Sequence, residues 1–320
     1  MATHRSHCRS FTGQKGITLV EILVAIVIMS IVTVATMALY TTTSEGYRNV
    51  DADQEIQNNG RFALDQLAVA IRHAGYQERV FTPGDGSDQF GDTIFNSAYM
   101  MDNGKIPTRH IEAVNNSVIT SLSSSTDFGV AGANNGVNAS DVLTSRFFGS
   151  QISTDAASGS SSIMQSCMGI AGGYPTGVDD LVVSSFSVRI LKNEPELYCK
   201  GKTTAGVWEG NQIVRGVETF QLVLGVSTDV TSLQPVRWLS PEQMVATDWP
   251  NVMAVRVGMV IRGAVGSVPL PPAALVYYPL GEAFANGNTT NSFQFTAPRD
   301  TRLRRVFNAT YKLRNHTINR

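Results

Sequence analysis

The chain has 320 residues, and its 25 Lys and Arg residues almost balance its 26 Asp and Glu residues. A formal net charge of −1 gives no overall electrostatic basis for binding nucleic acid or an anionic lipid surface. Only 16% of the residues are charged, whereas Ser, Thr, Asn and Gly are plentiful. This composition is more typical of a secreted, β-rich domain than of a cytosolic enzyme.

The N-terminus combines a short basic leader with a long apolar run. Residues 1–16 hold three basic residues and no acid, and the apolar run over residues 17–40 is interrupted by one carboxylate, Glu21. As a helix that rises about 1.5 Å per residue, residues 17–40 would measure roughly 36 Å, enough to span a bilayer. The charge asymmetry predicts that the leader stays in the cytoplasm while the rest of the chain is translocated.

Glu21 is the informative residue of this run, because a carboxylate in lipid is costly unless it has a partner. A cut between Gly16 and Ile17 would make Glu21 the fifth residue of the mature chain, in the first turn of a helix. Unsatisfied N–H groups and the positive end of the helix dipole favour an anion there. The new α-amino group of Ile17 could pair with Glu21 of its own chain or of a neighbouring subunit.

The stretch from Lys15 to Val32 resembles the N-terminus of type IV prepilins. In that family a basic leader ends in Gly, a membrane aspartyl peptidase cuts after it, the new first residue is N-methylated, and the fifth mature residue is Glu. Gly16 and Glu21 match this pattern, while Ile17 stands where the family usually has Phe. The resemblance therefore implies cleavage between Gly16 and Ile17 and N-methylation of Ile17.

The alternative for this segment is an ordinary secretory signal or membrane anchor. Residues 36–38, Thr-Met-Ala, offer a small-residue cleavage site. A secretory apolar core is typically about 7–15 residues long, so the run before this site is too long for that reading.

The helix is expected to continue beyond the apolar run to about Ala74. Leu64, Leu67 and Ile71 recur at helical spacing, and Gly75 is a plausible stop. Gly46 and Gly60 each weaken a helix by about 1 kcal/mol relative to Ala and are expected to mark bends.

Several later segments read as strands because β-branched and aromatic residues alternate with polar ones. In residues 182–190, Phe186 and Val188 share one predicted face with Ile190. In the tail, Phe307, Ala309, Tyr311 and Leu313 are expected to face a core. The expected strands are residues 141–149, 182–191 with a hairpin partner at 196–199, 213–226, 254–262 and 301–315; residues 77–135 and 263–290 are expected to be loops.

Three cysteines are present, and Cys8 would leave with the leader. The remaining pair, Cys167 and Cys199, reads as a disulfide in an exported domain. It would close a loop of about 33 residues, worth roughly 3–4 kcal/mol in the chain-entropy model. Two free buried thiols are the alternative.

Several short segments of the sequence resemble the corresponding segments of the PilW family of minor pilins. In that family an Arg-Ala-Gly-Tyr-like motif ends the first helix. The matching segments are residues 60–64, 71–76, the Cys-x-Gly at 167–169, Tyr198-Cys199, 213–226, the Trp-x-x-Val-x-x-Val-Arg run at 249–256, and the tail. The resemblance implies an α+β, pilin-like lollipop with a long N-terminal hydrophobic helix and a head built on antiparallel β-sheet. The expected domains are the leader (1–16), a transmembrane or filament-core helix (17–40), the periplasmic half of that helix (41–76) and a β-rich head (77–320).

The resemblance also implies a non-enzymatic function, with no cofactor, metal or catalytic residue. The expected protein is a minor pilin that primes type IV pilus assembly through its N-terminal helix and Glu21, with a place at the pilus tip and a link to twitching motility. Its expected location is the inner membrane, with a periplasmic head, and then the pilus. The expected partners are the prepilin peptidase, other minor pilins, the major pilin, the inner-membrane assembly platform and membrane lipid.

The C-terminal tail offers a second, weaker interpretation. Residues 301–320 hold six Lys or Arg residues and no acid, which could indicate DNA binding. The positive charge is local and lacks interleaved exposed aromatic residues, so a final strand with a solvated basic face is the favoured interpretation and nucleic acid is not an expected partner.

Two other functions stay open. A minor pseudopilin of type II secretion, resembling the J subunit, would carry the same peptidase signal. A membrane-tethered periplasmic hydrolase or binding protein is disfavoured, because we find no Gly-x-Ser-x-Gly, zinc-ligand spacing or glycine-rich phosphate loop. The histidines outside the leader are His73, His110 and His316, and a lone His at a helix end is far more often structural than catalytic.

Overall fold

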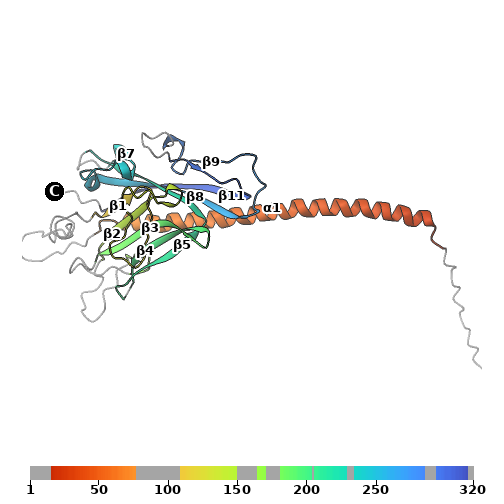
Figure 1. The fold of residues 1–320 in the computed structure, drawn as a ribbon, viewed down its shortest axis with the longest axis horizontal. Helices are drawn as coiled ribbons and strands as arrows, with labels where there is room; N and C mark the ends of the chain where they lie inside the picture. Colours follow the sequence, from red (N-terminus) through yellow and green to blue (C-terminus); the bar gives the residue numbers. More distant parts are fainter. Residues whose placement is uncertain are drawn as a thin grey trace, which may run out of the picture. The chain divides into compact units, whose positions relative to one another are not determined.

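The computed structural model describes residues 16–76, 109–149, 164–170, 181–203, 205–228, 234–284 and 293–315. The chain divides into two compact units, residues 1–50 and 51–320. We call the second the globular unit. Helix α1 (Leu19–His73) runs through both, and all the strands belong to the globular unit (Figure 1). The predicted α+β fold is confirmed, with one long N-terminal apolar helix and a globular domain of antiparallel sheet.

In the first unit, α1 is apolar and exposed. The helix is uninterrupted over 55 residues, and it includes a window long and apolar enough to cross a membrane, none of which is buried. Most of the leader, residues 1–15, lies outside the described residues, so its role stays a prediction.

The first sheet of the globular unit is an antiparallel meander in the order β1-β2-β3-β4-β5. Its strands are β1 (Ile111–Val114), β2 (Val142–Phe147), β3 (Val182–Leu191), β4 (Glu194–Lys202) and β5 (Trp208–Arg215). The predicted hairpin of β3 with residues 196–199 is present, and it places Phe186 opposite Cys199. The short strand β1 falls in a segment that the sequence analysis assigned to loop.

The second sheet has the order β11-β8-β6-β7 and is also antiparallel. Its strands are β6 (Val217–Val226), β7 (Arg237–Leu239), β8 (Val252–Val265) and β11 (Arg302–Lys312), and a separate small ladder joins β9 (Val276–Tyr277) to β10 (Phe295–Thr296). Short 3-10 helices lie at Val137–Ala139, Pro241–Gln243, Trp249–Asn251 and Glu282–Phe284.

Gly216 separates what the sequence analysis treated as one strand group. It adopts φ +77°, and the chain passes there from β5 in the first sheet to β6 in the second. Its N–H donates to Pro195 O and its carbonyl accepts from Arg262 N, both at 2.8 Å. A left-handed residue suits glycine, which has no Cβ to clash. The strand group expected over residues 213–226 is therefore present as the end of β5 and the whole of β6, divided at Gly216.

The C-terminal part of α1 packs against both sheets. Leu67, Ile71 and Ala74 are fully buried, which confirms the predicted helical face. They join one core cluster with Phe186 of β3 and Phe220 of β6. Two hydroxyl groups also fix the helix backbone, since Ser145 of β2 donates to Ala70 O at 2.6 Å and Tyr311 of β11 donates to Leu64 O at 2.9 Å.

Neither Gly46 nor Gly60 interrupts α1, and the bends expected there stay a prediction. A Cβ on residue 60 would lie 2.3 Å from the ring of Phe307 on β11. The glycine therefore permits close approach of helix and sheet. Phe307 and Leu313 are buried and Ala309 and Tyr311 half-buried, so the predicted inward face of the tail strand is confirmed.

The alternation predicted for residues 182–190 holds only in part. Phe186 and Val188 are buried, but Ile190 is 60% exposed, and Ser185 and Ser187 on the opposite face are buried too. The reason is a second covering layer: the 115–136 segment crosses that face of the sheet. Buried Lys200 ties it down by donating from Nζ to the carbonyls of Ser121 and Asp127.

The outer face of the second sheet is covered by the chain between β8 and β11. Arg256 Nε donates to Leu280 O at 3.0 Å, and Leu280 is fully buried. Val260 packs with Phe295 and Ala297. Within the expected exposed loop over residues 263–290, Pro279 and Leu280 are buried, because polar turn residues do not reveal an apolar inner side. Most of residues 264–276 are exposed as expected, and residues 285–290 lie outside the described residues.

Candidate assembly site

Thr18 and Glu21 form a capping box at the start of α1. Glu21 N–H donates to Thr18 Oγ1 at 3.3 Å, while the N–H and hydroxyl of Thr18 donate to Glu21 Oε2 at 2.9 and 3.0 Å. Ile22 N–H donates to Thr18 O, which makes Thr18 the N-cap residue. Reciprocal bonds of this kind satisfy backbone donors that a helix start otherwise leaves open.

From the sequence, Glu21 was predicted to interact with the helix dipole and with the new α-amino group of Ile17. The role of Thr18 was not predicted. The signal was readable, since Thr-x-x-Glu before an apolar run marks a capping box. The consequence is that one carboxylate oxygen of Glu21 is held within its own chain. A carboxylate accepts about four hydrogen bonds, so Glu21 keeps capacity for a further donor.

The predicted cleavage point lies just before this box. Residues 16–18 are non-helical, and the side chain of Ile17 is 74% exposed. A cut there would leave the new amino group on the residue next to the N-cap. Cleavage at Gly16 and methylation at Ile17 stay predictions.

The helix beyond the box has apolar side chains on every side. Ile22, Leu23 and Val24 are consecutive, and each is about half exposed. The hydroxyl groups of Ser30 and Thr33 donate to carbonyls within the helix, both at 2.7 Å. A helix that is apolar all round needs lipid or partner helices around it, and internally bonded hydroxyl groups suit both environments.

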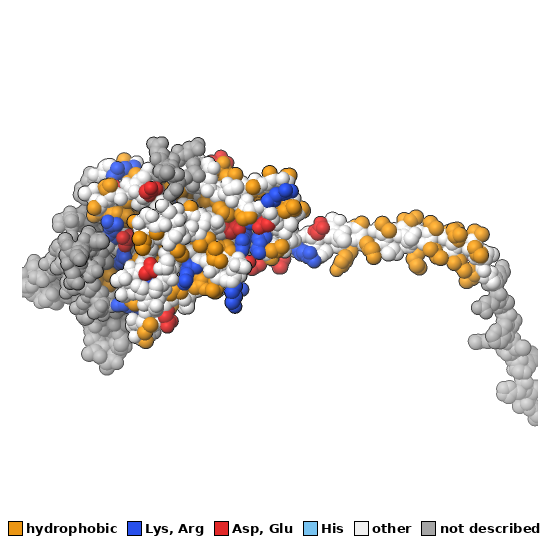
Figure 2. Space-filling view, in the orientation of Figure 1, with side chains coloured by type: hydrophobic (Ala, Val, Ile, Leu, Met, Phe, Trp, Pro, Cys, Tyr) orange, Lys and Arg blue, Asp and Glu red, His pale blue; other side chains and the backbone are white. Residues whose placement is uncertain are grey.

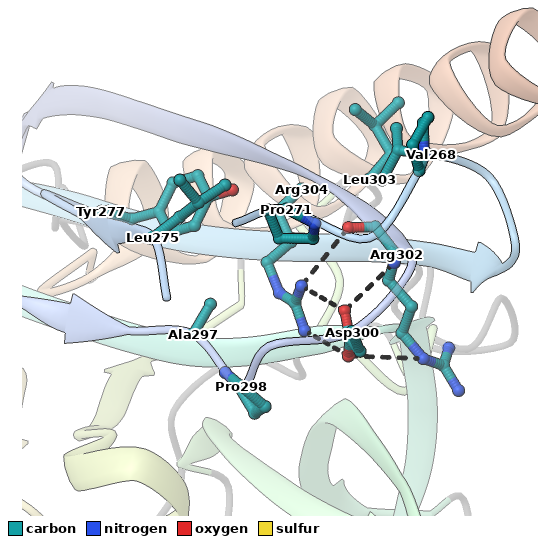
Figure 3. Close-up of a pocket in the computed structure, with 11 residues that line it drawn as sticks. Val268, Pro271, Leu275, Tyr277, Ala297, Pro298, Asp300, Arg302, Leu303 and Arg304 are labelled. Atoms are coloured by element: carbon teal, nitrogen blue, oxygen red, sulfur yellow. Dashed lines mark hydrogen bonds and ion pairs between the residues drawn. The ribbon is translucent and has the colours of Figure 1, made fainter. Parts of the chain in front are cut away.

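The globular unit holds a second cluster, a closed ring of three arginines and three carboxylates that we call the arginine–carboxylate ring. Each arginine contacts two of the acids and each acid contacts two of the arginines (Figure 3 shows the Arg304–Asp300–Arg302 part). In order around the ring, the pairs are Glu218–Arg304 (2.5 Å), Arg304–Asp300 (2.7 Å), Asp300–Arg302 (4.0 Å), Arg302–Glu194 (3.4 Å), Glu194–Arg262 (2.8 Å) and Arg262–Glu218 (3.2 Å).

The arginine–carboxylate ring joins β4 of the first sheet to three strands of the second. Hydrogen bonds from the Arg304 guanidinium lower the pKa of Asp300. Burial alone would raise the pKa of Glu194, but Arg262 and Arg302 hold it below its ordinary value. Charges that balance inside the ring leave no attraction for an external anion, so its role is to clamp the two sheets.

This ring corrects the interpretation of the basic tail. Arg304 is buried, and its neighbour Arg305 pairs with Asp53 of α1 at 2.7 Å. The expected solvated basic face was therefore wrong for Arg302 and Arg304, which are engaged within the protein, whereas Arg305, Lys312 and Arg314 are exposed as expected. Glu194, Glu218 and Asp53 lie far away in sequence, and Asp300 stands one residue before the 301–320 window, so the charge count over that window could not reveal these acids.

Cys167 and Cys199 are joined in a disulfide, with their Cα atoms 6.3 Å apart. The bond fastens the 164–170 segment to β4. Cys167 N–H also donates to Ser184 Oγ of β3 at 3.0 Å.

His73 lies against a strand of the first sheet. His73 contacts Phe147 edge to face, with ring centroids 5.3 Å apart, and burial lowers its pKa. His316 lies outside the described residues. Within the described ranges, no group of three or more His, Cys, Asp or Glu side chains is placed to hold a metal ion.

Comparison with known families finds two matches. The family model for the type IV pilus-assembly protein W, PilW, matches residues 185–315, and the prokaryotic N-terminal methylation motif matches residues 11–37. Over residues 185–315, which are fewer than half of its 320 residues, the chain is similar to the PilW family. The methylation motif contains the whole capping box, and the PilW match contains all six residues of the arginine–carboxylate ring. The matches point to a structural component of a pilus rather than an enzyme.

Other comparisons add little to this PilW match. A solved type IV-like pilin from Thermus thermophilus has 14% sequence identity and a TM-score of 0.31, over 64% of this chain and 83% of that chain. A likeness at this level does not define the fold. No curated protein sequence matches the chain significantly.

Proposed function

We propose that this protein is a minor pilin of the PilW family that acts in the initiation of type IV pilus assembly. The observation that carries the proposal is the capping box of Thr18 and Glu21, which opens a helix with exposed apolar side chains on every side and lies inside the methylation motif. Such a helix suits storage in lipid first and a bundle of like helices later.

In this mechanism the prepilin peptidase cuts after Gly16, and Ile17 becomes the methylated first residue. Lipid and a helix bundle are similarly apolar, so transfer between them gives little net driving force. The pairing of Glu21 with the amino group of Ile17 on a neighbouring subunit would then set register and partner choice. Thr18 holds one oxygen of Glu21 and leaves the carboxylate able to accept this cation.

The proposed location follows from the same helix. The chain is held in the inner membrane with its globular unit in the periplasm, and it then enters the pilus, at or near the tip. Its proposed partners are other minor pilins, the major pilin and the inner-membrane assembly platform. The family match and the exposed apolar helix support these contacts.

The test is piliation of a deletion strain that expresses variants. Glu21→Gln should insert into the membrane normally but restore few pili, because a neutral amide cannot pair with the amine. Glu45→Gln, an exposed acid on the same helix, is the matched control and should restore wild-type pilus number. Wild-type piliation with Glu21→Gln would refute the mechanism. Normal piliation in the deletion strain together with lost exoprotein secretion would instead assign the protein to a type II secretion pseudopilus.

A further inference from the structure

The 263–281 segment of the globular unit presents an apolar outer surface. From Gly263 to Gly281 no side chain carries a charge. Val265 is 68% exposed, Leu270 is 53% exposed and Leu275 is 49% exposed. Figure 2 shows hydrophobic side chains exposed on the visible face of this unit. Contiguous exposed apolar residues on a soluble domain mark a surface that meets another partner.

A shallow pocket of about 220 Å³ lies between this segment and the start of β11. Pro271, Leu275 and Tyr277 line it, and the Asp300–Arg304 pair forms its polar part (Figure 3). That pair belongs to the arginine–carboxylate ring, in which every charge is already matched. The pocket is thus mainly apolar, and its charged groups are already paired. It is better suited to bind an apolar group than a polar ligand.

Arg299 places an exposed cation at the border of the apolar surface. Arg299 is exposed, and its Nε donates to Pro271 O at 2.8 Å, which holds the side chain against the 263–281 segment. Unlike Arg302 and Arg304, it has no acidic partner among the residues that the structure describes. An uncharged apolar surface with a free guanidinium at its border complements acyl chains beneath anionic headgroups.

We propose that the apolar surface of the 263–281 segment, together with Arg299, docks the globular unit on an anionic lipid bilayer. The side chains of Leu270 and Leu275 would enter the boundary between headgroups and acyl chains. Arg299 would pair with a lipid phosphate, which guanidinium groups bind in a bidentate manner. The overall charge of −1 does not oppose this docking, because the attraction is local.

The connection between the apolar run and the globular unit strengthens such a weak contact with the bilayer. Residues 41–51 separate the apolar run from Ala52, the first buried residue of the globular unit. Even fully extended, these residues reach at most roughly 40 Å. A surface confined so close to a bilayer binds at a high effective concentration. This step rests on the proposed membrane anchoring of the chain.

The test uses the full chain reconstituted in phosphatidylcholine vesicles with roughly 30% phosphatidylglycerol. An environment-sensitive fluorophore is attached through Leu270→Cys, and nitroxide-labelled lipids serve as quenchers. The matched control carries the label through Val130→Cys, because Val130 is 65% exposed on the segment that covers the first sheet. We expect quenching at position 270 to exceed that at position 130 about fivefold, and to fall to the control level with Arg299→Gln or without phosphatidylglycerol.

Equal quenching at the two positions would overturn the proposal, as would strong quenching that depends on neither Arg299 nor phosphatidylglycerol. A fluorescence change at position 270 that occurs only after other pilus subunits are added would also overturn it, and it would assign the surface to a protein partner. Vesicle flotation of the same samples measures anchoring separately. Docking that fails while the chain floats with the vesicles therefore leaves the proposed function intact.

Discussion

Gly60 of α1 and Phe307 of β11 are in direct contact, and this contact fixes how the helix lies on the second sheet. A Cβ on residue 60 would lie 2.3 Å from Phe307 Cε1, closer than real carbon atoms approach. The ring covers the helix backbone where any other residue would present a side chain. The glycine is therefore needed for packing, even though it lowers helix propensity.

Gly60→Ala should destabilise the globular unit by roughly 1–3 kcal/mol, because overpacking outweighs the gain in helix propensity of about 1 kcal/mol. Gly46→Ala has open space around its Cβ and should not destabilise it. Urea unfolding followed by the fluorescence of buried Trp249 measures both. Adding Phe307→Leu to Gly60→Ala should recover part of the loss. Equal stability of the two single variants would contradict the close packing.

Arg304→Gln should cost roughly 3–5 kcal/mol, since it removes one of the two arginines that pair with buried Glu218 and opens the ring. Arg305→Gln, the next residue on β11, removes only a partly exposed pair with Asp53 and should cost at most about 1 kcal/mol. The same unfolding measurement compares them. Similar losses in the two variants would show that the arginine–carboxylate ring does not clamp the sheets.

The arginine–carboxylate ring should also make stability depend on pH. The pKa of Asp300 is lowered by Arg304, so its ionised form stabilises the folded state above the ordinary pKa of about 4, and this contribution is lost as the pH falls through the folded value. Wild type should therefore be more stable than Asp300→Asn at pH 7, and the difference should shrink as the pH falls below about 4. A difference that does not change with pH would contradict this.

Asp141 gives stability the opposite dependence on pH, so its contribution must cancel in the comparison of wild type with Asp300→Asn. Burial raises its pKa to about 7, although the backbone N–H groups of Asn116 and Leu222 donate to its oxygens. The contribution of Asp141 to the stability of the folded state is present below the ordinary pKa of about 4, and it is lost as the pH rises towards 7. Because wild type and Asp300→Asn share Asp141, their difference isolates Asp300.

Thr18→Val should destabilise the first turn of α1, because it removes the hydroxyl group that bonds to Glu21 in the capping box. In micelles, amide exchange over residues 19–22 should rise about fivefold, as expected for the loss of an N-cap. Thr18→Ser should retain the box. Thr36→Val is the control, because the Thr36 hydroxyl bonds only to carbonyls of its own helix. Unchanged exchange with Thr18→Val would show that the box contributes little.

Local patterns predicted the helix, its buried face, its end near Ala74 and most strands. Periodicity reports these features because it depends only on neighbouring residues. The predictions that failed concern contacts between residues distant in sequence. The role of Gly60 depends on its contact with Phe307, and the burial of Arg304 depends on its pairing with Glu218. Similarly, the burial of Ser185 needs the 115–136 segment above it, which no pattern within β3 reveals.

The candidate assembly site was predicted more completely than the globular unit. Gly16, Ile17 and Glu21 lie within six consecutive residues, so their spacing could be read directly. Thr18 was missed only because the dipole argument already accounted for Glu21, not because its signal was absent. The arginine–carboxylate ring, by contrast, draws its acids from three separate segments and could not be anticipated.

The most direct test is the mass of the N-terminal peptide of this protein, purified from pili of native cells. Our account predicts a peptide that begins at Ile17 and carries one added methyl group, because the amine that meets Glu21 exists only after the leader is removed. A pilus-incorporated chain that still begins at Met1, or one cut to begin at Thr18 or Leu39, would contradict it.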